Sequence, residues 1–432
     1  MDTQIIVVFC LCVIVQKLVK GWFNRICGAA GRSLRKQNRN GQANYMRLKL
    51  ILPVVEAESY SQPEDCPYGC AGKEFFLRQE VKKRVYDTLH CEVKARRYEC
   101  LSCCRTFRVY PQGINQKQFS QRAVGMAVML YLLGLSYGAV VLMLEALGLW
   151  IGKTTVYEAV QRVAERVPGM RQANLLQGYR TPALGADLTS VKCKGKWLAL
   201  GVTVDAITGL TLSIDQLSGE DAQTLKEWLE PIIESVDAHV LVTDDADALK
   251  TAADHNGVYQ QVCTSHVGRN THALIEQLQT SLANAFNPSL EQIGVSVQQA
   301  LLDLQRLKEL IHLRQPEARS ELESMYQRYQ EARPSPKGKP ASIAYRLRNL
   351  LLDRWNLWPR LTFYREWKDA TGRQILDGTN NATERSIGWW IKERYRSMRG
   401  YKREQSALNV SRLIAHCGSH LESGLNLATL IT

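Results

Sequence analysis

The chain has 432 residues, of which 45% are hydrophobic and 22% are charged, and its formal net charge is +13. This composition excludes a disordered or fibrous protein and leaves room for about three globular domains. The basic surplus favours a polyanionic partner, most commonly DNA or RNA; the alternative is a solvated basic surface without a partner.

Residues 1–61 are predicted to be an N-terminal extension that is disordered or not part of the native protein. Ile5–Val15 form an apolar run too short to span a bilayer, and Asp2 stands where a signal peptide would carry basic residues. The next stretch, 16–45, is basic and rich in Gly and Asn, and a second methionine, Met46, precedes a more ordinary opening. We therefore expect no membrane partner.

Residues 62–113 are predicted to form a zinc ribbon. Two cysteine pairs are each spaced like a metal-binding knuckle, and together they can place four thiolates around one Zn²⁺. A cysteine cluster inside a long basic chain favours metal binding over a secreted disulfide domain. Cys91 and Cys104 are candidate substitute ligands, or packed or free thiols. The predicted ligands are Cys66, Cys70, Cys100 and Cys103, and strands are expected at 74–77, 82–89, 95–98 and 106–110.

Residues 114–170 are predicted to be helical and to form a helix-turn-helix. Ser120 can cap a first helix, Leu135-Ser-Tyr-Gly138 starts a second, and a break at 148–152 precedes a third. Short helices around a glycine-containing turn are typical of this motif, whose recognition helix contacts DNA with its first residues. The alternative is a helical hairpin that packs for its own sake. The candidate DNA contacts are Lys153, Thr154, Thr155 and Tyr157.

Residues 181–267 have the element order of a ribonuclease-H-like α/β domain, and they would form the first part of a catalytic domain. Three strands, with a hairpin turn at 206–209, are followed by a helix, a strand, a helix and a last strand. The whole chain is thus expected to be a multidomain α+β and α/β protein. The expected strands are 183–189, 196–205, 210–217, 238–243 and 258–262.

Three carboxylates are candidate ligands for divalent cations. Asp187 lies on the first strand, Asp244 follows the fourth, and Glu384 starts a later helix. Carboxylates that converge on one site can bind two Mg²⁺ or Mn²⁺ ions, and without metal they repel one another and raise one another's pKa. Other residues compete, because an Asp at a strand end is often a turn or cap residue. Asp205 and Asp215 compete with Asp187, and Asp245 and Asp247 compete with Asp244.

Residues 268–375 are expected to form an all-helical insertion, and residues 376–420 the final helices of the catalytic domain. A basic helix is predicted at 385–403, where aromatic residues interleave with the cations. Basic residues neutralise phosphates and aromatic residues stack on bases, although we expect Trp389 or Trp390 to belong to the core. The candidate DNA contacts are Arg385, Lys392, Arg394, Arg396, Arg399, Lys402 and Arg403.

Four motifs together resemble the DDE transposases of bacterial insertion sequences. Their order and spacing are similar to those of the large group, Mutator-like elements included, that has a Cys-x-x-His motif and a helical insertion before the glutamate. The similarity covers roughly 62–415, zinc ribbon and helix-turn-helix included. The motifs are Gly185-Ala-Asp187-Leu-Thr189, Leu241-Val-Thr-Asp244-Asp-Ala246, Cys263-Thr-Ser-His266 and Asn380-Asn-Ala-Thr-Glu384.

The resemblance implies an enzyme that cuts and joins DNA, with Asp187, Asp244 and Glu384 as a metal-binding triad. It places Cys263 and His266 near the active site, where His266 would contact substrate phosphate or position the triad. Zinc binding and simple packing are the alternatives for this pair, although two ligands alone do not make a zinc site. Double-stranded DNA with terminal inverted repeats, target DNA, a dimer or higher assembly, and a bacterial cytoplasmic, nucleoid-associated location are also implied.

Two other functions stay open. The first is a catalytically silent regulator derived from such an enzyme, which binds DNA through its zinc ribbon and helix-turn-helix. The intact carboxylates argue against it. The second is a ribonuclease-H-like nuclease without joining activity, which the zinc ribbon and the long insertion disfavour.

Overall fold

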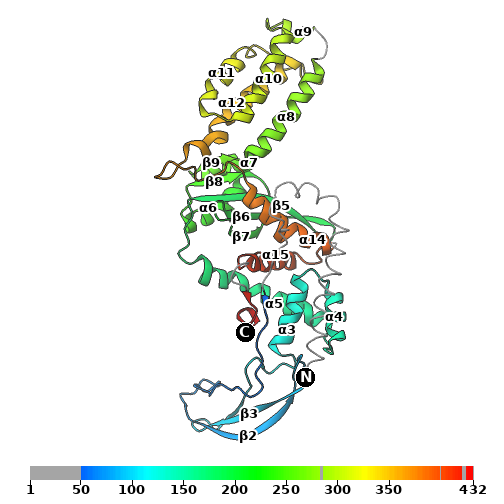
Figure 1. Cartoon of the computed structure of the whole chain (residues 1–432), viewed down its shortest axis with the longest axis vertical. Coiled ribbons are helices and arrows are strands. Elements are labelled where there is room, and N and C mark those ends of the chain that lie inside the picture. Colours follow the sequence, from blue (N-terminus) through cyan, green and yellow to red (C-terminus); the bar gives the residue numbers. More distant parts are fainter. Residues whose placement is uncertain (1–49, 283–285, 399, 421–424, 432) are drawn as a thin grey trace. The chain divides into compact units, whose positions relative to one another are not determined.

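The computed structural model describes residues 50–282, 286–398, 400–420 and 425–431. The run Ile5–Val15, the stretch up to residue 45 and the candidate DNA contact Arg399 lie outside these ranges. Over its described part the chain is a mixed α/β protein with separate β-sheets and several groups of helices (Figure 1). None of the described helices combines the length and apolar character that a bilayer crossing needs.

A three-stranded antiparallel sheet occupies the predicted zinc-ribbon region. Its strands, in spatial order, are β2 (Phe75–Arg84), β3 (Glu92–Cys100) and β4 (Thr106–Val109). The two strands predicted at 74–77 and 82–89 form the single strand β2. A register shift between Leu77 and Gln79 lets the ladder continue, as a β-bulge does, so the irregular pattern there does not end the strand.

Residues 50–61 belong to the packed structure, so the predicted end of the extension at residue 61 is wrong. Val55 is buried in a small core with Val85, Val93 and Ile114. Strand β1 (Leu50–Ile51) pairs in parallel with β10 (Leu425–Asn426) near the other end of the chain. Pairings this short leave no periodic pattern, and for that reason the sequence did not indicate them.

Three helices follow the ribbon, as predicted: α3 (Gln121–Leu132), α4 (Tyr137–Ala146) and α5 (Lys153–Arg171). Ser120 and Ser136 cap the first two, each accepting a hydrogen bond from the backbone N–H three residues on. Helix α5 buries one apolar face and packs against α15 (Glu404–Gly418) from the C-terminal part of the chain. The buried face consists of Val156, Val160, Val163 and Val167.

The central sheet has five strands in the spatial order β7-β6-β5-β8-β9. Its first three strands along the chain are antiparallel, whereas β5, β8 and β9 run parallel. This is the predicted sequence of elements, and it makes β5 and β8 neighbours. The elements are β5 (Ala183–Cys193), β6 (Lys196–Asp205), β7 (Thr211–Gln216), α6 (Ala222–Val236), β8 (Val240–Thr243), α7 (Asp247–His255) and β9 (Tyr259–Val262).

The region between β9 and the C-terminal helices is helical, and it has its own apolar core around Trp358 and Tyr329. Its buried Asp303 accepts hydrogen bonds from Arg328 (2.5 Å) and from Tyr329 (2.8 Å). The helices are α8 (Thr264–Ser281), α9 (Pro288–Glu291), α10 (Val297–Leu313), α11 (Arg319–Gln327) and α12 (Ile343–Glu366).

The helix predicted at 385–403 does not extend to residue 403: the helical run continues to Met398 and includes a π-helical segment. Helix α13 (Asn381–Ser386) passes into a π-helix, η3 (Ile387–Lys392), and then into α14 (Glu393–Met398). Beyond it Tyr401 runs beside the end of β5, where its N–H donates to the carbonyl of Lys192 (2.9 Å). This strand-like pairing draws the chain out of the helical path, so Lys402 and Arg403 precede α15 and do not belong to the basic helix.

Candidate active site

Asp187 lies within β5, and the charges of Asp244 and Glu384, the two other predicted metal ligands, act on its carboxylate. Its Oδ1 accepts a hydrogen bond from the N–H of Leu188 (2.7 Å). The pKa of Asp187 is raised to about 6, chiefly by burial and also by the negative charges of Asp244 and Glu384, and the Leu188 N–H partly offsets the rise. Lys392 acts in the opposite direction. Three carboxylates and one ammonium group are therefore electrostatically linked here.

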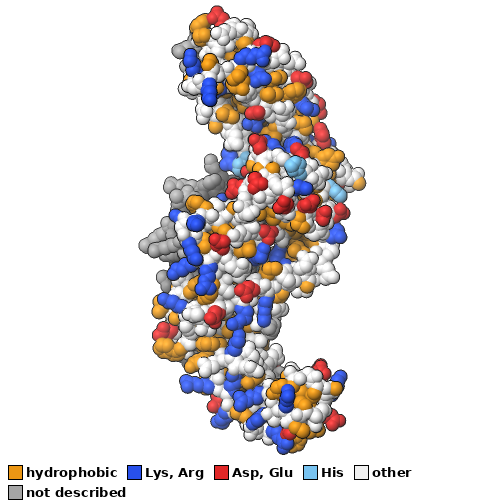
Figure 2. All heavy atoms as spheres, turned by 180° about the vertical axis from the view of Figure 1, so that it is seen from behind, with side chains coloured by type: hydrophobic (Ala, Val, Ile, Leu, Met, Phe, Trp, Pro, Cys, Tyr) orange, Lys and Arg blue, Asp and Glu red, His pale blue; other side chains and the backbone are white. Residues whose placement is uncertain are grey.

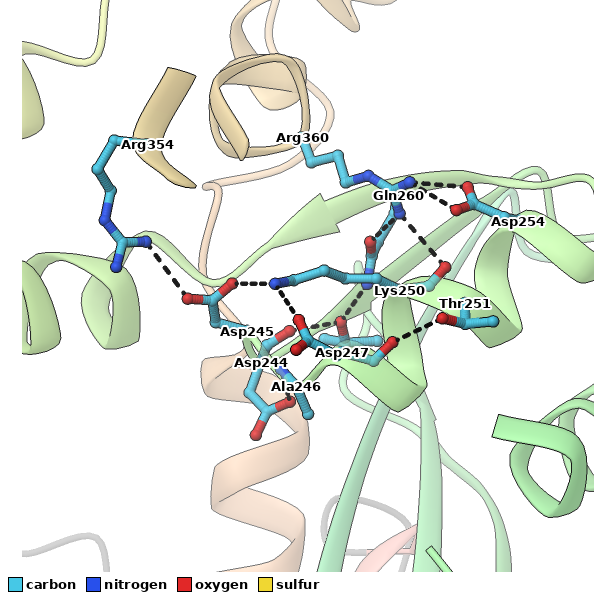
Figure 3. A network of polar contacts seen from close by, with 11 residues as sticks. Asp244, Asp245, Ala246, Asp247, Lys250, Thr251, Asp254, Gln260, Arg354 and Arg360 are labelled. Atoms are coloured by element: carbon cyan, nitrogen blue, oxygen red, sulfur yellow. Dashed lines mark hydrogen bonds and ion pairs between the residues drawn. The ribbon is translucent and has the colours of Figure 1, made fainter. Parts of the chain in front are cut away.

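Asp244 follows β8 and stands apart from the ion-pair network beside it (Figure 3). In that network Lys250 Nζ lies 2.8 Å from a carboxylate oxygen of Asp245 and 2.9 Å from one of Asp247, and Arg354 also contacts Asp245. The Asp244 carboxylate points away from these cations, and its Oδ1 accepts a hydrogen bond from the N–H of Ala246 (3.2 Å). Among the described residues, the Asp244 carboxylate accepts one local backbone hydrogen bond and forms no ion pair, whereas Asp245 and Asp247 are paired.

The two competitors of Asp187 have structural partners. Asp205 is 3% exposed and accepts hydrogen bonds from the hydroxyl of Tyr179 (2.5 Å) and from the backbone of the following turn. Asp215 accepts hydrogen bonds from Arg412 (2.6 Å) and from the indole of Trp228 (3.2 Å). Hydrogen bonds of this kind indicate a structural role for both carboxylates.

Asn380 fixes the segment that carries Glu384, and the sequence did not predict this role. It is 1% exposed, and its Nδ2 donates to the carbonyl of Ala186 in β5 (3.2 Å). Its backbone N–H contacts Cys263 Sγ (3.3 Å), and its Oδ1 accepts a hydrogen bond from Thr383 (2.6 Å). An amide just before a helix was the available signal, because Asn is common at helix starts.

Replacing Gly185 with alanine is expected to displace α13. A Cβ at this position would lie 2.5 Å from Thr383 Oγ1 and 2.9 Å from Val204 Cγ2. Overpacking of this kind costs about 1–3 kcal/mol of unfolding free energy, which urea denaturation measures. Gly268→Ala is the control, because nothing lies within 4 Å of its Cβ position. Equal stability of both variants would contradict the close approach of α13 to β5.

Cys263, His266 and Glu384 form a second group of close ligand atoms. Cys263 is the N-cap of α8, His266 lies in the first turn of that helix, and Glu384 comes from α13. Their candidate ligand atoms all lie within 4.8 Å of one another, and His266 Nδ1 is 3.5 Å from Glu384 Oε1. Among the described residues, Asp187, Asp244 and Glu384 do not form a group this tight.

The pKa of Asp187 predicts a specific pH dependence of stability. The ordinary value is 3.8 and the folded value is about 6. The folded state therefore binds this proton more tightly than the unfolded state does. The free energy of unfolding is highest below pH 4 and falls as the pH rises from 4 to 6, by about 3 kcal/mol at most. In buffers without Mg²⁺ or Mn²⁺, Asp187→Asn should be more stable than wild type at pH 7.5, with a smaller difference at pH 4. A difference that is the same at both pH values would contradict this.

Four cysteine sulfurs lie together at the start of β2 and the β3–β4 connection. The Sγ atoms of the four predicted ligands are all within 4.8 Å of one another, with Cys66 to Cys103 at 3.7 Å and Cys70 to Cys100 at 3.5 Å. The pKa of the Cys100 thiol is lowered to about 7. The backbone N–H of Cys103 has the largest effect, the N–H of Ser102 adds to it, and burial opposes both. This arrangement can hold one tetrahedral zinc ion. Both proposed substitutes, Cys91 and Cys104, are exposed and outside the cluster.

The candidate DNA contacts divide into exposed and internally engaged side chains. Arg394 is 5% exposed, lies over the ring of Tyr131 at 4.1 Å and donates to the carbonyl of Leu135. Tyr157 hydrogen-bonds Ser406 (3.0 Å) and carries the guanidinium of Arg403 over its ring. Thr155 is half-buried. The exposed ones are Lys153, Thr154, Arg385, Lys392, Arg396, Lys402 and Arg403.

Basic side chains also cover the zinc-ribbon sheet. On the face shown in Figure 2, Lys and Arg side chains lie over this sheet, at the bottom of the view. Lys82 and Lys94 keep 78% and 65% of their side chains exposed. In η3, Trp390 is buried and Trp389 is 38% exposed, so one of these two tryptophans belongs to the core, as we expected. An exposed basic sheet is a surface to which a phosphate backbone can bind.

Comparison with known proteins gives a limited result. No protein-family model matches the chain, and no curated protein matches its sequence. Similar solved structures include the trimeric and dimeric forms of the HTLV-2 integrase catalytic core domain in complex with magnesium, each 19% identical with a TM-score of 0.17. They cover 28% and 29% of this chain, and 96% and 84% of their own. A TM-score this low carries no inference about activity.

Proposed function

We propose that the chain is a DDE transposase, which binds the ends of a mobile element and cuts and joins DNA strands. Its catalytic domain is ribonuclease-H-like, and Asp187, Asp244 and Glu384 are its metal ligands. The observation that carries the proposal is geometric: Asp187 lies on β5, Asp244 follows the adjacent parallel strand β8, and Asn380 ties the segment that carries Glu384 to β5. The raised pKa of Asp187 agrees with it. Carboxylates whose charges act on one another are costly as mere structure, and bound cations remove that cost.

The three residues would bind Mg²⁺ or Mn²⁺ ions, because their ligand atoms are the hard oxygens that these ions prefer. Bound ions would activate the attacking oxygen and stabilise the leaving oxygen of a phosphodiester. Asp187 and Asp244 come from adjacent parallel strands, and Asn380 fixes the backbone before Glu384. Lys392, whose charge acts on Asp187, would neutralise a DNA phosphate bound beside the site.

The reaction has two steps, and in each of them an oxygen atom attacks the phosphorus of a phosphodiester while another oxygen leaves. In the first, a water oxygen bonds to phosphorus as the bond to the 3′-oxygen breaks, which frees a 3′-hydroxyl. In the second, the oxygen of that hydroxyl bonds to the phosphorus of a target phosphodiester as the bond from that phosphorus to the target's 3′-oxygen breaks, and the departing 3′-oxygen takes up a proton. The carboxylates hold the same positions in both steps, so one site serves both. Exposed Lys153, Thr154 and the zinc-ribbon surface would bind the element ends, and a dimer would pair two ends.

The direct test is strand cleavage and joining in Mg²⁺ on linear DNA that carries candidate ends from the sequence flanking the gene. Wild type should produce nicked and joined strands, and Glu384→Gln should produce neither while still binding the DNA. Glu317→Gln, an exposed glutamate of the helical insertion, is the control and should match wild type. A wild-type protein that binds ends without cutting them would favour the silent regulator, and equal activity in Glu384→Gln would refute the triad.

A further inference from the structure

The Cys-x-x-His pair after β9 has a third partner that the sequence did not reveal. Two ligands alone do not make a zinc site, but the structure adds Glu384 to Cys263 and His266. The three residues offer a thiol, an imidazole and a carboxylate, with their ligand atoms within 4.8 Å of one another. A zinc ion needs no more than this from the protein, since many zinc sites have three protein ligands and a water molecule.

The backbone holds these ligands in place from two sides. The N–H of Cys263 donates to the carbonyl of Thr243 (2.7 Å), and the N–H of Thr264 donates to that of Gly378 (2.9 Å). The first of these bonds ties the start of α8 to β8, and the second ties it to the segment before α13. Because His266 is one helical turn after Cys263, both side chains lie on the same face of the chain. The positions of Cys263 and His266 are therefore fixed by backbone hydrogen bonds that do not require a bound metal ion.

Access to the group is open on one side. The Cys263 side chain is fully buried, whereas those of His266 and Glu384 are 31% and 38% exposed. A fourth position can thus be filled by water. Packing explains the burial of Cys263, whose sulfur contacts the N–H of Asn380. Packing alone does not account for a partly exposed imidazole and carboxylate that converge on this sulfur.

The group of Cys263, His266 and Glu384 prefers a different metal ion from the one that Asp187 and Asp244 prefer. Thiolate and imidazole bind Zn²⁺ well, whereas Mg²⁺ takes oxygen ligands. Glu384 is common to both groups. In the structure it belongs to the tight group with Cys263 and His266, and its relation to Asp187 is the looser one. An ion bound by sulfur and nitrogen would therefore hold the glutamate where it already lies.

We propose that Cys263, His266 and Glu384 form a zinc site, distinct from the four-cysteine site, and that zinc bound there withholds Glu384 from the catalytic ions and inhibits strand cleavage. The inhibitory part rests on the proposed function, whereas the binding part does not. Zinc takes cysteine as the thiolate, so the thiol proton is released to solvent on binding. No other co-reactant is needed.

Zinc content tests the site without any reference to activity. Full-length protein equilibrated with buffered Zn²⁺ and freed of excess should hold about two ions per chain, one in each group. Cys263→Ser should hold about one, and so should Cys66→Ser/Cys70→Ser. Cys417→Ser is the control for loss of a buried thiol outside both groups and should hold two. Wild type with one ion, or Cys263→Ser with two, would overturn the site.

Two further measurements guard against a misfolded serine variant. His266→Asn changes a partly exposed residue and should also lose one ion. Co²⁺ added to protein that holds one equivalent of zinc, which fills the four-cysteine site and leaves Cys263 free, should give a sulfur-to-cobalt absorption band in wild type and in Cys417→Ser. The band should be absent from Cys263→Ser, and its presence there would overturn the assignment of the sulfur.

Inhibition is tested by Zn²⁺ titration of Mg²⁺-dependent strand cleavage, starting from protein with only the four-cysteine site filled, and each protein is normalised to its own rate before Zn²⁺ is added. The Zn²⁺ concentration that halves the rate should be at least about tenfold higher for Cys263→Ser than for wild type, as expected when a ligand is lost. Equal sensitivity would overturn the inhibitory role. If the wild type cuts no DNA, the proposed function fails, whereas the zinc count still decides the site.

Discussion

Asp187→Asn is expected to lower Mg²⁺-dependent strand cleavage by on the order of a thousandfold or more, an effect of at least about 4 kcal/mol on the activation barrier. Asparagine keeps the size of the side chain and can still accept the hydrogen bond of Leu188. It lacks the negative charge that two cations share. The loss should therefore appear in the rate of the chemical step, measured by single-turnover cleavage, and not in DNA affinity.

The same variant should also be the more stable protein when no Mg²⁺ is present, because it removes a buried charge next to two others. Loss of activity together with gain of stability distinguishes a catalytic carboxylate from a structural one. Asp247→Asn is the matched control, since this carboxylate is almost fully exposed and pairs with Lys250. A similar loss of cleavage in both variants would mean that Asp187 has no special role.

Cys100→Ser is expected to unfold the zinc ribbon and to weaken binding to element ends by more than about a hundredfold. Cys100 is fully buried at the end of β3, and its sulfur is one of four that converge. Structural zinc contributes about 10–16 kcal/mol in zinc-finger peptides, far more than a small three-stranded sheet supplies alone. Fluorescence anisotropy with end DNA measures the affinity, and proteolysis should cut selectively within 62–113.

Cys91→Ser provides the comparison, because Cys91 is exposed and outside the cluster. It should keep both the zinc and the affinity of wild type. If Cys100→Ser bound end DNA as well as Cys91→Ser does, the ribbon would not be the end-binding surface. If Cys91→Ser lost zinc instead, the ligand set would have to be revised.

The order of elements around the sheet could be predicted because buried strands and amphipathic helices leave strong periodic patterns. Strand β6 begins and ends at the predicted residues, and Ser120 caps α3 as its position before an apolar run indicated. The four clustered cysteines were likewise readable from spacing alone. These features depend on residues that are close in sequence or repeat at a fixed period.

Contacts between distant segments could not be read in this way. The guanidinium of Arg394 lies over Tyr131, far away in the sequence, so a residue predicted to bind DNA is buried in the protein. Asn380 became visible as a positioning residue only through its bond to the carbonyl of Ala186. The third partner of the Cys-x-x-His pair is also a product of the fold. Periodicity has no signal for any of these.

Electron paramagnetic resonance of Mn²⁺, bound to protein that holds one equivalent of zinc in its four-cysteine site and none at Cys263, tests the central claim most directly, because it detects the ions and not the reaction. Wild type should show a spin-coupled Mn²⁺ pair, as expected for ions about 3.5–4 Å apart. Asp187→Asn should lose the coupled signal, and Asp247→Asn should keep it. Uncoupled Mn²⁺ in wild type, or a coupled pair that survives in Asp187→Asn, would contradict a shared two-metal site.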